Sequence, residues 1–291
     1  MIFARLVVLL IMLLSITSCS GRDRIVIGSK NFTEQVILGE LLAQQIENKT
    51  SLSVDRRLNL GGTLICHQAI TAGQLDIYVE YTGTALAAIL KEPPTGNAGE
   101  VYEKVRTAYR DQFQVEWTEP LGFNNTFAIV VRAADAANLN LKTISDAAAF
   151  TRNWTAGFGY EFVEREDGYS GLSKTYNLQF PSPPRVMDLG LTYKALADGQ
   201  VDFIAGNSTD GLIESLKLVS LEDDKQYFPP YDAVPLIRED TLQKHPELRQ
   251  VLRDIGGKIS EQQMRRLNFL VDGEHRDVKE VVRTFLTEQG L

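Results

Sequence analysis

Short apolar runs alternate with amphipathic segments along the first third of the chain. This pattern predicts three strands, each followed by a helix, in the order 25–28, 33–47, 53–60, 63–72, 75–81 and 84–90. Strands that alternate with helices are typical of a mostly parallel sheet covered by helices.

A Pro- and Gly-containing loop follows at residues 93–97, and a second α/β set comes after it. The further helices and strands are expected at 101–109, 115–119, 124–131, 155–160, 189–197, 201–205 and 218–221. Three helices complete the chain at 246–255, 260–270 and 278–288. Two α/β sets without a flexible linker form either one large enzyme domain or two lobes joined by short strands. Ligands of such sheets bind beyond the carboxyl ends of the strands, where two facing lobes would form a cleft.

The composition is that of an ordinary globular protein: 291 residues, of which 44% are hydrophobic and 23% charged. The net charge of −8 argues against a nucleic-acid partner, which requires a basic surface. The three histidines are far apart in sequence and show no metal-ligand spacing, so no metal or other cofactor is expected.

The N-terminus has the order of a secretion signal, with a positive charge in residues 1–5 and an apolar run over 6–14. The sequence Ile-Thr-Ser-Cys that ends at Cys19 resembles a bacterial lipobox, in which the cysteine is acylated. We therefore expect residues 1–18 to be removed as a signal peptide. The alternative is a short anchor helix, but the run is well below the ~20 residues that span a bilayer. Cys66 then has no intramolecular partner and is expected to be a buried apolar residue.

Two segments that follow strands contain candidate binding residues. Lys30 lies just before the start of the first helix, where a positive charge and free backbone N–H groups can hold an anion. The alternative is a capped helix with a solvated lysine. Tyr81 ends the third strand on the same face as Ile77 and Val79. It is either a ligand-facing ring or a core aromatic whose hydroxyl is bonded internally.

Six motifs, in order, resemble the glycine betaine/choline/carnitine-binding proteins of osmoprotectant ABC importers. They are GSKNFTEQ at 28–35, YVEYTGT at 78–84, GFNNTF at 122–127, YEFVEREDGY at 160–169, STDG at 208–211 and FPPY at 228–231. The resemblance covers essentially the whole mature chain. It implies an α/β, two-lobed type II periplasmic-binding-protein fold with the ligand cleft between the lobes. Lobe 1 would comprise residues 19–124 and 226–291, and lobe 2 residues 125–225.

The resemblance also assigns roles in the ligand site. Lys30, Thr84 and Arg165 fall on the side that holds a ligand carboxylate, for which arginine can offer two parallel hydrogen bonds. A quaternary ammonium has no N–H to donate and is attracted by ring faces. The rings that would surround this ammonium are Tyr81, Phe127 and Tyr231. The sequence departs from the family at Asn207, which stands where a tyrosine often completes the cage.

The expected function is that of an extracytoplasmic, lipid-anchored binding protein that delivers a small zwitterion to separate permease and ATPase subunits. An enzyme is the main rival. No GxSxG motif is present, and Glu161 and Glu164 at a helix start are interpreted as surface charges. A sensor lipoprotein with the same fold, or a binder of another zwitterion such as an amino-acid derivative, is the second alternative.

Overall fold

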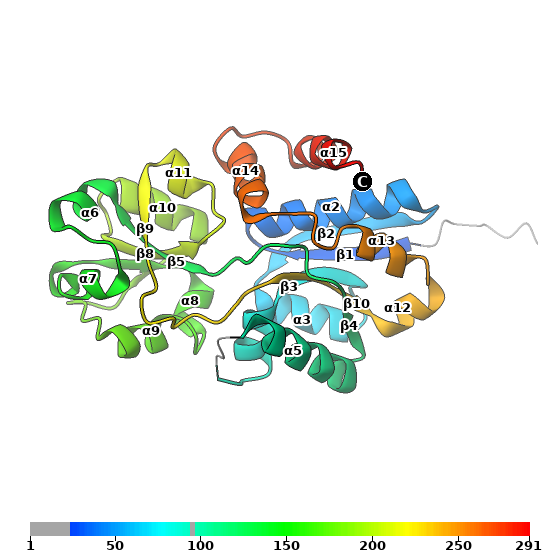
Figure 1. The fold of residues 1–291 in the computed structure, drawn as a ribbon, viewed down its shortest axis with the longest axis horizontal. Coiled ribbons are helices and arrows are strands. Elements are labelled where there is room, and N and C mark those ends of the chain that lie inside the picture. The colour runs from blue at the N-terminus through cyan, green and yellow to red at the C-terminus, as the bar shows by residue number, and fades with distance from the viewer. Residues whose placement is uncertain (1–23, 94–96) are drawn as a thin grey trace, which may run out of the picture.

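The computed structural model describes residues 24–93 and 97–291 of the chain. Within these residues the strands form two five-stranded sheets, in the orders β2-β1-β3-β10-β4 and β7-β6-β8-β5-β9. Figure 1 shows the two sheets side by side, each covered by helices, with β1 and the C-terminus on the same lobe, which we call lobe 1. The expected α/β, two-lobed architecture is confirmed.

Lobe 1 is built from the two ends of the chain. Its N-terminal elements are β1 (Arg24–Lys30), α2 (Thr33–Lys49), β2 (Ser53–Gly61), α3 (Thr63–Thr71), β3 (Ile77–Tyr81), α4 (Thr82–Thr84), η1 (Ala85–Ile89), α5 (Ala98–Phe113) and β4 (Val115–Trp117). Its C-terminal elements are β10 (Ala233–Arg238), α12 (Glu239–Lys244), α13 (Leu248–Asp254), α14 (Glu261–Asp272) and α15 (Val278–Gln289). Strands β1, β2 and β3 are parallel, whereas β10 is antiparallel to β3 and β4.

Lobe 2 is inserted between β4 and β10. Its elements are β5 (Phe127–Arg132), α6 (Ala133–Leu139), α7 (Ile144–Ala148), η2 (Thr151–Asn153), β6 (Ala156–Phe158), α8 (Tyr160–Glu164), α9 (Tyr169–Tyr176), β7 (Arg185–Val186), α10 (Leu189–Ala197), β8 (Phe203–Asn207), α11 (Leu212–Ser215) and β9 (Leu218–Leu221). Strand β5 is antiparallel to both β8 and β9.

Two chain segments, 118–126 and 222–232, cross between the lobes. They touch at an isolated antiparallel bridge between Asn124 and Asp232, and the Asn125 N–H donates to the Tyr231 carbonyl at 3.0 Å. In Figure 1 they run between the sheets as two loops, the first green and the second yellow. Because they are paired, the two crossings form a short common connection instead of two independent linkers.

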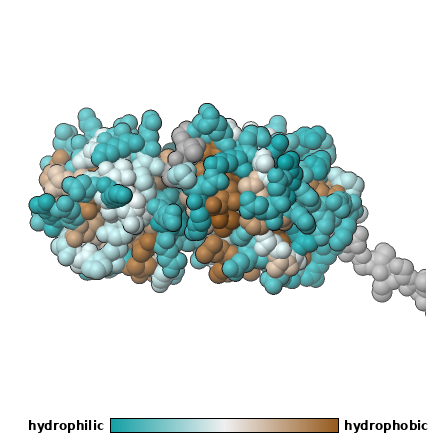
Figure 2. Space-filling view, turned by 90° about the horizontal axis from the view of Figure 1, so that it is seen from below, coloured by the Kyte–Doolittle hydropathy of each residue, from teal (hydrophilic) through white to brown (hydrophobic). Residues whose placement is uncertain are grey.

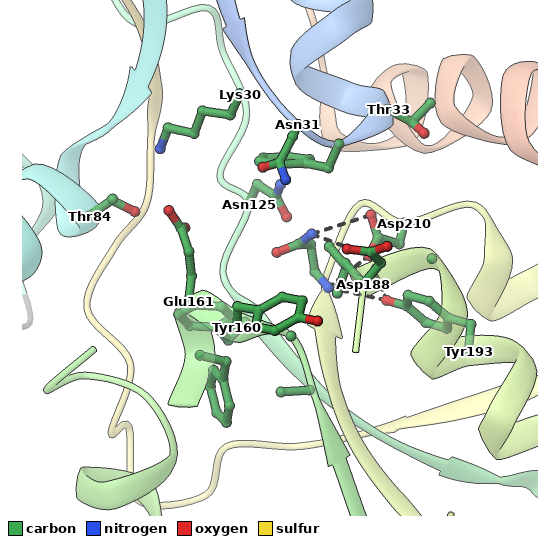
Figure 3. A pocket seen from close by; sticks show the side chains of 18 of the residues that line it. Lys30, Asn31, Thr33, Thr84, Asn125, Tyr160, Glu161, Asp188, Tyr193 and Asp210 are labelled. Atoms are coloured by element: carbon green, nitrogen blue, oxygen red, sulfur yellow. Dashed lines mark hydrogen bonds between the residues drawn. The ribbon is translucent and has the colours of Figure 1, made fainter. Parts of the chain in front are cut away.

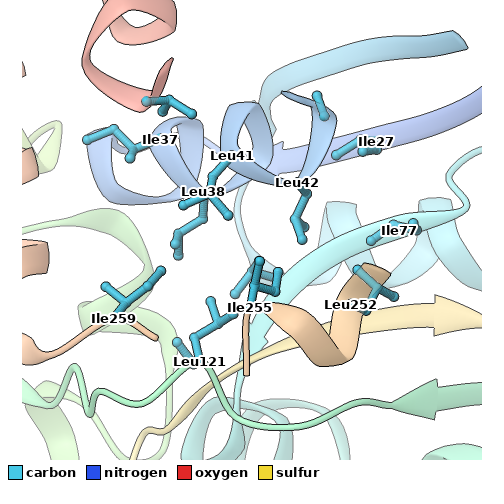
Figure 4. Packing of buried hydrophobic residues seen from close by; sticks show 14 of the residues in the cluster. Ile27, Ile37, Leu38, Leu41, Leu42, Ile77, Leu121, Leu252, Ile255 and Ile259 are labelled. Carbon is cyan, nitrogen blue, oxygen red and sulfur yellow. The ribbon is translucent and has the colours of Figure 1, made fainter. Parts of the chain in front are cut away.

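Each face of each sheet has its own hydrophobic cluster. Strand β3 is buried along its whole length, with Ile77, Val79 and Tyr81 on one face and Tyr78 on the other, as the alternation predicts. Figure 4 shows how α2 covers the first of these faces. Its packing residues in that view are Ile37, Leu38, Leu41 and Leu42. This packing fixes the carboxyl ends of β1 and β3, where the first candidate residues lie.

The segment after β3 differs from the expected regular helix. A short α-helical turn at Thr82–Thr84 passes directly into a π-helix at Ala85–Ile89. π-Helical turns are rare and are found mainly at functional sites. Here the irregular turn follows directly after Thr84.

Cys66 is fully buried and free, as expected, and burial raises the pKa of its thiol to about 12. Among the residues described, no helix combines the length and apolar character needed to cross a bilayer. Seen from below, the outer faces are mainly hydrophilic, and apolar surface gathers towards the middle of the molecule (Figure 2).

Candidate ligand-binding site

A cavity of about 290 Å³ lies between the lobes, at the small end of the usual range for ligand pockets. Both lobes and both crossing segments contribute side chains to it. The structure brings together all seven residues that the sequence nominated, and each of them lines this cavity: Lys30, Tyr81, Thr84, Phe127, Arg165, Asn207 and Tyr231.

Lys30 reaches the cavity from the last residue of β1 and is not a solvated lysine. Its side chain is only 2% exposed, and its ammonium forms a buried ion pair with Glu80 on β3. The Lys30 Nζ also lies 5.1 Å from the centre of the Tyr81 ring. A buried charge needs such a partner, because an unpaired ion would be costly to desolvate.

Arg165 enters from lobe 2, just after α8, with a side chain that is 9% exposed. Its Nε donates to Asp167 Oδ1 at 2.8 Å and its Nη2 donates to Asp167 Oδ2. Its Nη1 donates across the cavity to Thr84 Oγ1 at 3.2 Å. The Nε–Nη2 edge is therefore already occupied, and a ligand carboxylate can meet only the remaining N–H groups of Nη1 and Nη2.

The three nominated rings already contact protein cations. Arg165 Cζ lies 5.0 Å from the centre of the Phe127 ring and 5.9 Å from that of Tyr231. Phe127 and Tyr231 pack edge to face at 5.6 Å, and the Tyr231 hydroxyl donates to Asp167 at 2.6 Å. Tyr81 satisfies both readings of the sequence, since its hydroxyl donates to Glu34 at 2.6 Å while its side chain lines the cavity.

Sequence reasoning missed four further rings of the cavity, Phe162 and Tyr193 on lobe 2 and the two described next, Phe32 and Tyr160. Phe32 stacks on Tyr81 with the ring centres 6.3 Å apart. Tyr160 is 58% exposed and lies at the start of α8. Both belong to the motifs that carry the family resemblance, and their place in those motifs was the only signal that could have nominated them.

The wall of the cavity that lies opposite Lys30 and Thr84 is polar (Figure 3). Asp210 Oδ2 accepts from the Tyr193 hydroxyl at 2.6 Å and from the Asn207 N–H at 3.0 Å. Burial raises the pKa of Asp210 to about 7, although these hydrogen bonds oppose the shift. Asn207 therefore belongs to a wall of hydrogen-bonding groups, and Asp188 also lines this part of the cavity.

A buried carboxylate, Glu34 on α2, links the two lobes behind the cavity. Four groups donate to it: the Tyr81 and Thr209 hydroxyls, Asn125 Nδ2 at 2.7 Å and Asn268 Nδ2 at 3.1 Å. Burial raises the pKa of Glu34, and the four hydrogen bonds oppose that shift. Thr209 belongs to lobe 2, whereas Glu34 and Asn268 belong to lobe 1, so these bonds join the lobes.

A second contact between the lobes lies at the cavity rim. Helix α3 of lobe 1 has Gly62 at its N-cap, which offers no capping side chain. The Glu161 carboxylate of lobe 2 accepts from the Thr63 N–H and from the Thr63 hydroxyl, the latter at 3.3 Å. A side chain at position 62 would collide with this carboxylate. The surface interpretation is correct for Glu164, which is exposed, and wrong for Glu161.

Comparison with known proteins identifies the family of the chain. Residues 23–288 match the family described as the substrate-binding domain of the ABC-type glycine betaine transport system. The chain belongs to this family. Its members are the binding components of transporters and not enzymes, so an enzyme role is excluded and permease and ATPase partners are implied.

Individual relatives agree with the family. The chain is 38% identical over 295 residues to the carnitine transport binding protein of Listeria monocytogenes, covering 98% of this chain and 95% of that one. It is 35% identical over 268 residues to an ergothioneine transport permease/ergothioneine binding protein of Helicobacter pylori, covering 92% of this chain and 48% of that longer one. A crystal structure of a glycine betaine/carnitine/choline ABC transporter protein has a TM-score of 0.75, 33% identity, and coverage of 91% of this chain and 98% of that one.

Proposed function

We propose that this binding protein captures a quaternary-ammonium zwitterion outside the cell membrane and delivers it to its importer. The observation that carries the proposal is a single cavity in which two cationic side chains from opposite lobes and several aromatic rings come together. The names of the relatives, which refer to carnitine, glycine betaine and ergothioneine, support this ligand class.

In this proposal the carboxylate of the ligand binds between Lys30, Thr84 and Arg165. Each cation keeps N–H groups that its internal carboxylate partner does not use, since an ammonium has three and a guanidinium five. Lys30 comes from lobe 1 and Arg165 from lobe 2. A carboxylate that bonds to both is best satisfied with the lobes closed, so its binding stabilises the closed state.

The ammonium of the ligand binds at the faces of Tyr81, Phe127 and Tyr231. A cation near a ring face gains roughly 0.5–2 kcal/mol. Because Lys30 and Arg165 already lie near these rings, the ligand must share their faces or use the opposite ones. We therefore expect a weaker cage than one made of free rings, weakened further because Asn207 supplies no ring.

We also propose that Cys19 anchors the protein by acylation after residues 1–18 are removed. Both the cysteine and the signal peptide lie outside the described residues. We place the boundaries of the lobes at 124/125 and 225/226. The support for these boundaries is that both fall within the crossing segments, between the last strand of one sheet and the first strand of the other.

Calorimetric titration of glycine betaine, L-carnitine and choline into wild-type protein and Arg165→Ala tests the site. Loss of a hydrogen bond to a charged group should weaken both carboxylate ligands at least about tenfold. Choline has no carboxylate, so Arg165→Ala should cost it less affinity than it costs the betaines: choline loses only the Arg165–Thr84 contact between the lobes, while the rings lose a competing cation. Arg152→Ala is the matched control, since Arg152 is an exposed arginine of lobe 2 that bonds to Gln179. Equal losses for choline and the betaines would contradict the carboxylate role.

A further inference from the structure

The amide of Asn125 has a fixed orientation. Its Nδ2 donates to Glu34 Oε1 at 2.7 Å, and three other donors converge on the same carboxyl group. The nitrogen must face Glu34, because the reverse orientation would set an amide oxygen against a carboxylate oxygen. The amide oxygen, Oδ1, consequently points away from this cluster.

Asn125 Oδ1 accepts no hydrogen bond from any residue that the structure describes. The residue is only 6% exposed, and its side chain lines the cavity. A buried acceptor without a donor is unfavourable and uncommon in native proteins. Oδ1 itself has less than 1 Å² of exposed surface, so a donor on a bound molecule reaches it after a small rotation of the amide towards the cavity that Asn125 lines.

A second acceptor belongs to the same side of the cavity. The two strong hydrogen bonds to Asp210 both end on Oδ2. Among the residues that the structure describes, its Oδ1 has only a long contact of 3.5 Å with Asn207 Nδ2. In Figure 3 Lys30 and Thr84 lie at one side of the cavity, Asp210 and Asp188 at the other, and Asn125 between them.

This wall suits only some of the zwitterions that the proposed function allows. A ligand carboxylate would be repelled by Asp188 and Asp210. A trimethylammonium group could balance their charge but has no hydrogen to donate to either acceptor. If the closed cavity held such a ligand and no water, both acceptors would stay unsatisfied, which is costly in a buried site. An N–H or O–H group on the ligand removes that cost.

We propose that the physiological ligand is a quaternary-ammonium zwitterion with at least one N–H or O–H donor, which Asn125 Oδ1 and Asp210 accept. The inference rests on the proposed function and narrows its ligand class. Glycine betaine, which has no such donor, is then a weak ligand. A hydroxylated or imidazole-bearing betaine is a strong one, because a site built for a donor discriminates against analogues that lack it.

The test uses ligand pairs that differ only in the donor. L-Carnitine is compared with γ-butyrobetaine, the same molecule without its hydroxyl, and histidine betaine with its ring-methylated derivative that has no N–H. At least one pair should show a preference of about tenfold or more for the donor-bearing member in calorimetric titration. The comparison needs no variant and so does not depend on the folding of a mutant.

Two variants then locate the acceptor. Asn125→Ala and Asn268→Ala each remove one amide donor from Glu34, but Asn268 does not line the cavity. The preference within the pair should fall to less than about threefold in Asn125→Ala and persist in Asn268→Ala. Asp210→Ala, which removes none of the hydrogen bonds to Glu34, should also reduce it and serves if Asn125→Ala does not fold.

The outcomes separate the two proposals. If all quaternary-ammonium zwitterions bind and the members of both pairs bind equally, the donor inference is overturned and the proposed function stands. A preference that survives both Asn125→Ala and Asp210→Ala also overturns it. If no quaternary-ammonium zwitterion binds at all, the proposed function itself fails.

Discussion

Glu161→Ala should weaken ligand binding by loosening the closed state. The Glu161 carboxylate caps α3 across the lobe boundary, and a helix N-cap contributes roughly 1 kcal/mol. This contact joins residues of different lobes, so it stabilises the closed form relative to the open form. If the unliganded protein is mainly open, the full amount is lost from binding, and the dissociation constant should rise about fivefold.

The neighbouring Glu164→Ala is the matched control, because Glu164 lies on the same short helix and is exposed. Glu161 also lines the cavity, so a direct ligand contact must be separated from the closure effect. Gly62→Ala does this from the other lobe. Gly62 has φ −78° and ψ −173°, which an alanine adopts without strain, yet its Cβ would displace the carboxylate. Gly62 does not line the cavity.

Calorimetric titration measures the affinities, and small-angle scattering with and without ligand measures closure. Glu161→Ala and Gly62→Ala should show similar losses, and at a ligand concentration that half closes Glu164→Ala both should remain more open. The closure argument is refuted if Gly62→Ala binds like wild type while Glu161→Ala is impaired. In that case Glu161 acts only by touching the ligand.

Three further predictions concern stability and processing. Burial raises the pKa of Asp210 to about 7, so the folded state holds a proton that the unfolded chain loses near pH 4. This proton stabilises the folded state most at acid pH, and the stabilisation is lost as the pH rises through 7. Urea midpoints of wild type should thus fall relative to those of Asp210→Asn between pH 5 and pH 8, and parallel pH profiles would contradict this. Tyr81→Phe removes one donor from buried Glu34 and should lower the free energy of unfolding by roughly 1–3 kcal/mol in urea melts, while a betaine should bind as before because the ring remains. Mass spectrometry of membrane-extracted protein should find acylated Cys19 as the first residue, and any other mature N-terminus would rule out the lipid anchor.

Local patterns along the chain predicted most strands of the two sheets, but they missed strand β10 and helices α6, α7 and α9. The alternation in β3 correctly placed Ile77, Val79 and Tyr81 on one face. The carboxyl end of β1 correctly marked Lys30 as a residue near the cleft. These features depend on neighbours in sequence, which is why a periodic pattern reveals them.

The internal partners of the site residues could not be predicted in the same way. The Lys30–Glu80 ion pair joins residues 50 positions apart, and Glu161 contacts Thr63 98 positions away. Glu34 resembles an ordinary acidic residue in the first turn of a helix, yet the fold buries it among four donors. Long-range polar contacts of this kind have no local signature, which is why Glu161 was interpreted as a surface charge.

The direction of β1 determines which lobe moves when the cavity closes in a protein that is attached by its N-terminus. The strand starts at Arg24 and ends at the cavity with Lys30, so the point where an N-terminal tether would attach lies roughly 20 Å from the ligand. Lobe 2 is joined covalently to lobe 1 only by the paired crossing segments. In a protein held by its N-terminus, lobe 1 would stay in place and lobe 2 would move on closure. A fluorophore on lobe 2 would report ligand arrival without interfering with the attachment to a surface.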